Sequence, residues 1–206
     1  MWSLLPRKMQ LTVIVVAALA TAWGLEAAYQ QFAGKPVWIM KVVSLTVFVV
    51  GVALAGLFQL GWRWLWRTFP AFGRWVFPDL NGRWSGTLAS TWISPETGQG
   101  IPPIPTTVWI RQGLFTTSIR LKTGESQSFS TRAFLEPARE RGCYRLWYSY
   151  NNDPAAQFRH RSSPHEGVAF LEFETGLPSQ LRGTYYTARK TTGDIALAKV
   201  SADPNA

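Results

Sequence analysis

The pattern that decides the fold is LRGTYYTARKTTGDIALAKV, residues 181–200. Short alternating runs of this kind, separated by turn residues, are typical of neighbouring β-strands. Because successive side chains of a strand point to opposite faces, every second residue from Leu181 belongs to one face. That face changes from apolar to polar along its length, and its members are Leu181, Gly183, Tyr185, Thr187 and Arg189. We expect it to line a protein interior that is polar at one end.

Similar runs follow one another from the turn signal PDLNG, residues 78–82, towards the C-terminus. No helix-length apolar stripe interrupts them, and the eight predicted strands are residues 83–92, 106–112, 115–122, 127–135, 143–150, 166–173, 180–189 and 194–200. Short strands with mostly tight connections favour an up-and-down β-barrel, since closure removes the exposed sheet edges. A barrel of this size can enclose one small ligand. Residues 78–206 are therefore predicted to form an all-β ligand-binding domain.

Residues 1–77 differ in character and predict a membrane anchor. Seventeen uncharged residues separate Lys8 from Glu26 and twenty-one separate Lys41 from Arg63, against roughly 17 to 25 needed to span a bilayer as a helix. We expect a hairpin of two transmembrane helices, at about 9–30 and 38–62, followed by a juxtamembrane segment rich in tryptophan and arginine. A cleaved signal peptide is the alternative for the first span.

Positive charge sets the predicted orientation of this anchor. Arg7 and Lys8 precede the first span, and Arg63 and Arg67 follow the second. The positive-inside rule then places the N-terminus and the C-terminal domain in the cytoplasm. Seven basic residues but one acid lie within residues 1–77, so much of the net charge of +9 accompanies the anchor. This distribution favours membrane lipids and argues against a DNA or RNA polymer, which requires the cations on the folded domain.

The candidate ligand-binding residues come from the inward faces and from one long connection. Aromatic rings can stack on nucleobases and a cation can bind phosphate, so a polar, aromatic barrel end suits a nucleotide-like ligand. Residues 151–164 are expected to cover the barrel mouth as a lid. The candidates are Trp84, Tyr148, Tyr150, Asn151, His165, Tyr185, Thr187 and Arg189.

Several of these candidates have a simpler alternative interpretation. The rings of Trp84, Tyr148 and Tyr150 are compatible with ordinary barrel core. A histidine where a connection enters a strand, such as His165, often only satisfies backbone groups. Arg189 is compatible with a solvated hairpin. The sequence leaves these alternatives open.

Enzyme chemistry finds little support in the sequence. The two histidines are His160 and His165, and the motif HEG at 165–167 lacks the second histidine of a zinc-protease helix. A phosphate-binding loop and a serine elbow are also absent from the sequence, and Cys143 is the single cysteine. We therefore predict no catalytic residues, no metal and no cofactor, and expect a receptor or effector.

A set of spaced motifs together resembles a known family. Two predicted spans are followed by PDLNGxWxG at 78–86, IPxxVxIxQ at 104–112, HEG at 165–167 and LxGxYYTxRxTxG at 181–193. In this order the chain resembles the two-transmembrane, β-strand-rich effectors of CBASS, the bacterial cyclic-oligonucleotide anti-phage systems. The resemblance covers nearly the whole chain.

The resemblance implies a mechanism and a location. In that family a cognate CD-NTase, activated by infection, makes a cyclic dinucleotide that binds the barrel. The effector then forms a homo-oligomer and disrupts the bacterial inner membrane, so that the host cell dies or stops growing. Two alternatives stay open: a constitutive membrane-anchored adaptor, with outward Trp109 and Trp147 as its contact surface, and a barrel that binds a lipid.

Overall fold

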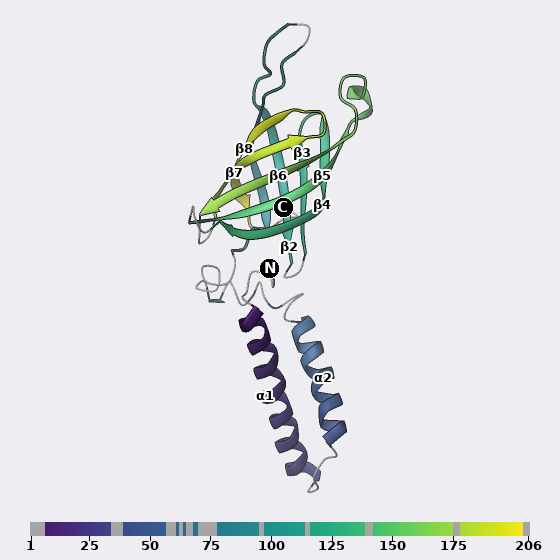
Figure 1. The fold of residues 1–206 in the computed structure, drawn as a ribbon, viewed down its shortest axis with the longest axis vertical. Helices are drawn as coiled ribbons and strands as arrows, with labels where there is room; N and C mark the ends of the chain where they lie inside the picture. Colours follow the sequence, from purple (N-terminus) through teal and green to yellow (C-terminus); the bar gives the residue numbers. More distant parts are fainter. Residues whose placement is uncertain are drawn as a thin grey trace. The chain divides into compact units, whose positions relative to one another are not determined.

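The chain forms two compact units, Trp2–Thr68 and Phe69–Ala206 (Figure 1). A computed structural model describes residues 7–33, 39–56, 61, 64, 68–69, 78–94, 97–113, 116–138, 142–174 and 178–203. The first unit is helical in its described part, and the second contains all the described strands.

The first unit contains helices α1, Arg7–Ala33, and α2, Ile39–Gly56. Within α1, the 25 residues Arg7–Gln31 form a candidate membrane span, about 37 Å long at the rise of an α-helix. Residues of its apolar window are not buried, and Leu19 and Trp23 are 65% and 76% exposed. A core helix of a water-soluble protein would bury one face, whereas a helix that is apolar all round suits lipid.

The second predicted span is described only in part. The apolar stretch Lys41–Ala53 of α2 is shorter than a full span, and residues 38, 57–60 and 62 of the predicted segment 38–62 lie outside the described residues. The same holds for Arg63, Trp66 and Arg67 of the predicted juxtamembrane segment. A hairpin that crosses the membrane twice therefore stays a prediction.

The second unit is a closed barrel of eight antiparallel strands in sequence order, with β8 paired to β1 (Figure 1). The strands are β1 Gly82–Ser90, β2 Ile104–Gln112, β3 Thr117–Lys122, β4 Ser126–Ala138, β5 Cys143–Pro154, β6 His165–Glu174, β7 Gln180–Thr187 and β8 Thr192–Ser201. The prediction of an eight-stranded up-and-down barrel is confirmed.

Several strands differ from their predicted ends, and for two of them the contacts give the reason. β5 continues four residues beyond the predicted end at 150, because both neighbouring strands extend beside it and pair Ser126 with Pro154 and Asn152 with His165. β7 ends at Thr187 instead of 189, because the Thr187 amide donates to the Thr191 carbonyl and Lys190 adopts a positive φ of 64°. These contacts close a turn that contains Arg189.

Residues that alternate along the strands point inward, and these faces form the barrel core. Buried members of these faces are Trp84, Val108, Ile110, Gln112, Leu146, Tyr148, Tyr150, Ala169, Leu171, Phe173 and Leu181. One end of the interior is closed by residues 78–81. There the Gln112 side chain accepts from the Leu80 amide at 2.6 Å and donates to the Pro78 carbonyl at 2.9 Å. Asn81 exchanges hydrogen bonds with the Gln112 backbone, so the polar groups of this plug are paired.

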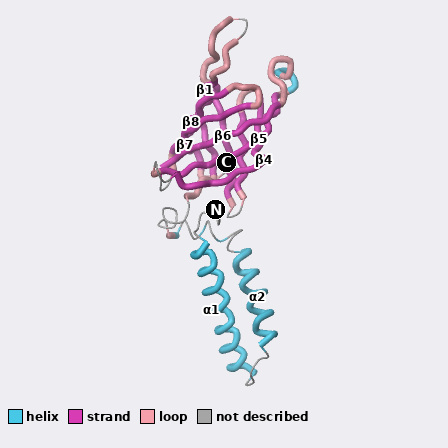
Figure 2. The backbone as a smooth tube through the Cα atoms, viewed as in Figure 1, coloured by secondary structure: helices cyan, strands magenta, loops and turns pink. Residues whose placement is uncertain are grey.

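The other end of the barrel carries the connections that follow the odd-numbered strands. In an up-and-down barrel these connections meet at one end, and here they are residues 91–103, 123–125, 155–164 and 188–191. Figure 2 shows two of them, between β1 and β2 and between β5 and β6, projecting beyond the strands. The β5–β6 connection contains the short 3-10 helix η4, Ala156–Phe158. This end, called the open end below, holds the candidate site.

Candidate ligand-binding site

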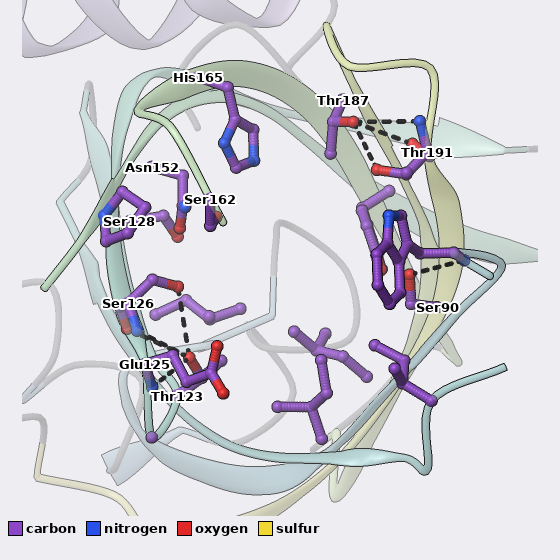
Figure 3. A pocket seen from close by; sticks show the side chains of 18 of the residues that line it. Ser90, Thr123, Glu125, Ser126, Ser128, Asn152, Ser162, His165, Thr187 and Thr191 are labelled. Carbon is purple, nitrogen blue, oxygen red and sulfur yellow. Dashed lines mark hydrogen bonds between the residues drawn. The ribbon is translucent and has the colours of Figure 1, made fainter. Parts of the chain in front are cut away.

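A cavity of about 570 Å³, here called the main cavity, occupies the open end of the barrel. Its size falls within the range of about 300 to 1,000 Å³ typical of small-molecule sites. All four connections of the open end contribute to its lining. The polar side chains in Figure 3 surround the cavity, and they are Ser90, Thr123, Glu125, Ser126, Ser128, Asn152, Ser162, His165, Thr187 and Thr191.

Tyrosine rings form one wall of the main cavity, on strands β5 and β7. Tyr148 and Tyr150 alternate along β5, with ring centroids 5.9 Å apart, and Tyr185 lies on β7. A glycine lies directly across the ladder from two of these rings: Gly167 from Tyr150 and Gly193 from Tyr185. Because glycine has no side chain, the tyrosine rings occupy the space above these two positions.

The close approach at these glycines is measurable. A Cβ built on Gly193 would lie 2.6 Å from Tyr185 Cε1, and a Cβ on Gly167 would overlap the Tyr150 ring. Backbone oxygens are also close, since the Cβ would lie 2.3 Å from the Ala89 oxygen at Gly193 and 2.6 Å from the Tyr186 oxygen at Gly167. Because real Cβ atoms do not approach neighbours so closely, both positions require glycine. The two glycines therefore set the orientation of the aromatic wall.

Burial raises the pKa of two tyrosines of this wall, Tyr148 and Tyr150. It raises the pKa of Tyr150 to about 12, with Tyr185 acting in the same direction and Arg189 opposing. It also raises the pKa of Tyr148 above its ordinary value. Both phenols are consequently neutral at physiological pH, and they offer hydrogen-bond donors and ring faces instead of a base.

Arg189 supplies a cation at the rim of the main cavity. Its Nη1 donates to Ser162 Oγ at 3.0 Å, which connects the β7–β8 turn with the β5–β6 connection. The turn is braced by Thr187, whose hydroxyl lies 2.6 Å from that of Thr191 (Figure 3). No carboxylate pairs with Arg189 among the residues that the structure describes. An anionic group entering the cavity can therefore use this guanidinium.

His165 lies at the start of β6 and lines the same cavity. Its Nδ1 is 3.0 Å from the Ser163 carbonyl, and because a carbonyl can only accept, this nitrogen carries a proton. Burial lowers the pKa of His165, and nearby Arg189 lowers it further, against the opposing effect of the Ser163 hydrogen bond. The imidazole is thus mainly neutral near pH 7, with Nε2 left to accept a hydrogen bond or to take up a proton.

Six of the eight predicted site residues line the main cavity: Tyr148, Tyr150, His165, Tyr185, Thr187 and Arg189. Trp84 faces inward but belongs to the core near the closed end, where its Nε1 donates to the Leu80 carbonyl at 3.1 Å. Lys199 Nζ lies 5.2 Å from the centre of its ring. Asn151 is exposed on the outer face of β5, because it alternates with the inward Tyr150. Trp84 and Asn151 therefore do not line the main cavity.

The cavity also contains residues that the sequence prediction omitted. Asn152 lies inward on β5, at the position that the alternation of Tyr148 and Tyr150 indicates, and Figure 3 shows it beside His165. Ser126 and Ser128 on β4 add hydroxyls to this side of the cavity. Trp92 lies beyond the end of β1 and lines the opposite rim. Ser162 belongs to the segment 151–164 that was predicted to cover the barrel mouth, whereas the short connection 123–125 carried no sequence signal.

The outward tryptophans considered for a protein contact are partly covered. The Arg120 guanidinium lies 5.2 Å from the centre of the Trp109 ring, and that of Arg145 lies 5.4 Å from the Trp147 ring. Trp147 Nε1 also donates to the Glu136 carboxylate at 2.6 Å. Arg120 points outward, because it alternates with the buried Ile119 and Leu121 of β3.

The chemistry of the cavity is that of a binding site. Among the described residues, no group of three or more His, Cys, Asp or Glu side chains could hold a metal ion. The site offers neutral phenols, hydroxyls, an amide, a neutral imidazole and the guanidinium of Arg189, together with the guanidinium of Arg161, which pairs with the Glu125 carboxylate in the same lining. This combination suits a ligand with flat rings and anionic groups.

Comparison with known proteins agrees with this chemistry. Residues 75–199, more than half of the chain, match the family model described as Cap15, cyclic dinucleotide receptor domain. The chain belongs to the Cap15 family. The resemblance to CBASS effectors is thereby confirmed at the level of the family, and the barrel is the receptor domain of that family.

Two curated relatives of the Cap15 family extend beyond the barrel. CD-NTase-associated protein 15 of Staphylococcus schleiferi is 28% identical over 173 residues, which cover 79% of this chain and 88% of the relative. The protein of the same name from Escherichia albertii is 25% identical over 210 residues, covering 97% and 98%. A receptor domain is a binding domain, whereas the absence of catalytic activity stays a prediction.

Proposed function

We propose that the main cavity binds a cyclic dinucleotide made by a cognate CD-NTase, and that the protein is a membrane effector of a CBASS anti-phage system. The observation that carries this proposal is the composition of the main cavity: a tyrosine wall shaped by glycines, with the Arg189 guanidinium at its rim. Membership of a family whose domain is described as a cyclic dinucleotide receptor supports the same ligand class.

The ligand-binding step is tested with the full chain in detergent. We expect a cyclic dinucleotide from a panel with different bases to raise the melting temperature, because a ligand that binds only the folded state stabilises it. Arg189→Gln should weaken binding about tenfold or more, as expected for loss of a charge-assisted hydrogen bond. Arg182→Gln is the matched control, since Arg182 is exposed on β7 away from the cavity. If every cyclic dinucleotide fails to bind, the proposal is wrong.

Assembly and membrane disruption form the second step of the proposal. Ligand binding at the open end is proposed to drive homo-oligomerisation, which concentrates the apolar helices in the inner membrane. The candidate span of α1 and the apolar, exposed surface of α2 support this role for the first unit. The proposed topology has two spans, with both the N-terminus and the barrel in the cytoplasm.

The membrane step is tested in cells that express the chain with or without a cyclic-dinucleotide synthase. A membrane-potential dye should report depolarisation only when both are present, and mass photometry of the purified chain should show larger particles upon addition of ligand. Unchanged polarisation despite measured ligand binding would remove the membrane step and leave the receptor function in place.

A further inference from the structure

A second, smaller cavity adjoins the main cavity on the outside of the barrel mouth. It has a volume of about 330 Å³ and is called the side cavity below. Three of its seven lining residues are arginines, Arg159, Arg161 and Arg189, and a fourth is His160. No carboxylate belongs to this lining, and the remaining members are Trp92, Ser163 and Thr191. The side cavity therefore offers cations and hydrogen-bond donors beside one aromatic ring.

The two cavities share several of their walls. Trp92, Arg161, Arg189 and Thr191 line both of them. One molecule can therefore occupy both cavities, with its rings against the tyrosine wall and an anionic group in the side cavity. The shared walls come from three different connections of the open end.

Two carboxylates outside the side cavity balance two of its arginines. Arg161 Nη2 lies 2.5 Å from Glu125 Oε1, and Arg159 Nη2 lies 3.0 Å from Asp153 Oδ1. All four side chains are more than half exposed, so these ion pairs contribute little stability and yield readily to a competing anion. With Arg189 free of a carboxylate among the described residues, the side cavity has one cation in excess.

We propose that the side cavity is a second phosphate subsite, which takes one phosphate group of the ligand whose rings occupy the main cavity. Arg161 is the specificity-determining residue of this subsite, and Glu125 competes with the phosphate for its guanidinium. The inference rests on the proposed function, because it assigns the second anionic group of a cyclic dinucleotide. A ligand with a single phosphodiester then gains less from this site.

The test compares two ligands on matched variants of the full chain in detergent. The ligands are the cyclic dinucleotide that binds the wild type most tightly and the linear dinucleoside monophosphate with the same bases, which has one phosphodiester. Arg161→Gln should lower the affinity for the cyclic ligand about tenfold, which is the lower end of the effect expected for loss of a charge-assisted hydrogen bond. The affinity for the linear ligand should change by less than about threefold. Arg182→Gln should leave the affinity for both ligands unchanged.

Glu125→Gln provides a test with the opposite sign. Removing the competing carboxylate should raise the affinity for the cyclic ligand a few-fold. If the ion pair between Glu125 and Arg161 is merely structural, the variant should instead bind the ligand more weakly. Weaker binding to Glu125→Gln would overturn the second subsite, as would an equal loss of both ligands in Arg161→Gln. Either result leaves the proposed function intact.

A wild-type chain that binds no cyclic dinucleotide would overturn the proposed function but not the subsite. Inorganic pyrophosphate is then the probe. A rise in melting temperature with pyrophosphate that is lost in Arg161→Gln and kept in Arg182→Gln supports an anion site in the side cavity. No rise in the wild type overturns it.

Discussion

At the scale of single residues, the binding surface depends on pairs in which one member is small. Gly167 faces Tyr150 across the β5–β6 ladder, and Gly193 faces Tyr185 across the β7–β8 ladder. In an ordinary strand, glycine weakens the sheet because it has no side chain to pack. Here the missing side chain makes room for a tyrosine ring of the main cavity. The loss of sheet stability at these glycines therefore accompanies the space that the tyrosine rings need.

Gly167→Ala should damage stability and binding together. The new methyl group would overlap the Tyr150 ring and lie 2.6 Å from the Tyr186 carbonyl oxygen, so the ring must move. We expect a destabilisation of about 1 to 3 kcal/mol, typical of overpacking, and loss of ligand affinity. Gly100→Ala is the control, because a Cβ there meets no atom within 4 Å. Unchanged melting temperature and affinity for Gly167→Ala would contradict this view of the wall.

His165 predicts a pH dependence of binding. Burial and Arg189 lower the pKa of His165 in the free protein below the ordinary histidine value of about 6.5. The imidazole is therefore neutral at physiological pH. A nearby phosphate would raise that pKa, and binding would then take up a proton. Affinity should therefore increase as the pH falls from about 7.5 to 5.5.

Titration calorimetry in two buffers of different ionisation enthalpy measures this proton uptake directly. In His165→Gln the affinity should stay flat over the same pH range. If the wild-type affinity is also flat, or falls with decreasing pH, His165 does not contact the anionic part of the ligand.

At the scale of elements, the length of β5 determines which polar side chains line the main cavity. The strand continues through Asn151, Asn152 and Asp153 to Pro154, although this polar stretch has low strand propensity. Pairing with the long neighbours β4 and β6 outweighs that propensity. As a result, one asparagine joins the main cavity and its neighbour faces outward.

This alternation gives a matched pair of variants. Asn152→Ala should weaken ligand binding about 3-fold to 10-fold, the expected effect of one or two neutral hydrogen bonds. Asn151→Ala should leave binding unchanged, although the sequence alone placed Asn151 among the candidates. Fluorescence anisotropy with a labelled cyclic dinucleotide compares the two, and a larger loss with Asn151→Ala would contradict the register of β5.

At the scale of the whole molecule, the chain consists of two compact units. Both cavities are lined by residues of the second unit alone, and the candidate membrane span lies entirely within α1. The proposed function therefore assigns recognition to one unit and the membrane effect to the other. Variants that separate the two activities test this division.

Leu19→Arg should remove the membrane effect while ligand binding is kept. Leu19 lies near the middle of the candidate span and is 65% exposed, and an arginine at such a position costs about 2.5 to 3.5 kcal/mol on insertion scales. We expect loss of synthase-dependent depolarisation, with unchanged affinity in detergent. Leu19→Phe, which stays apolar, is the control. Loss of ligand binding in Leu19→Arg would show that the units are not independent.

The local sequence determined the strands, their inward faces and six of the cavity residues, because a side-chain period of two is a property of the strand itself. It did not determine depth along the barrel axis. Trp84 and Tyr150 both face inward, but strand register and closure place one at the plugged end and the other in the main cavity. Alternation identifies a face, whereas depth depends on all eight strands together.

The side cavity could not be predicted from the sequence and follows only from the tertiary structure. Its residues come from connections that follow no period, and the ion pair of Glu125 and Arg161 joins positions 36 apart in sequence. Nothing in either segment shows that a turn after β3 meets a connection after β5. Closure of the barrel brings the odd-numbered strand ends together, and this sets positive side chains beside an aromatic interior.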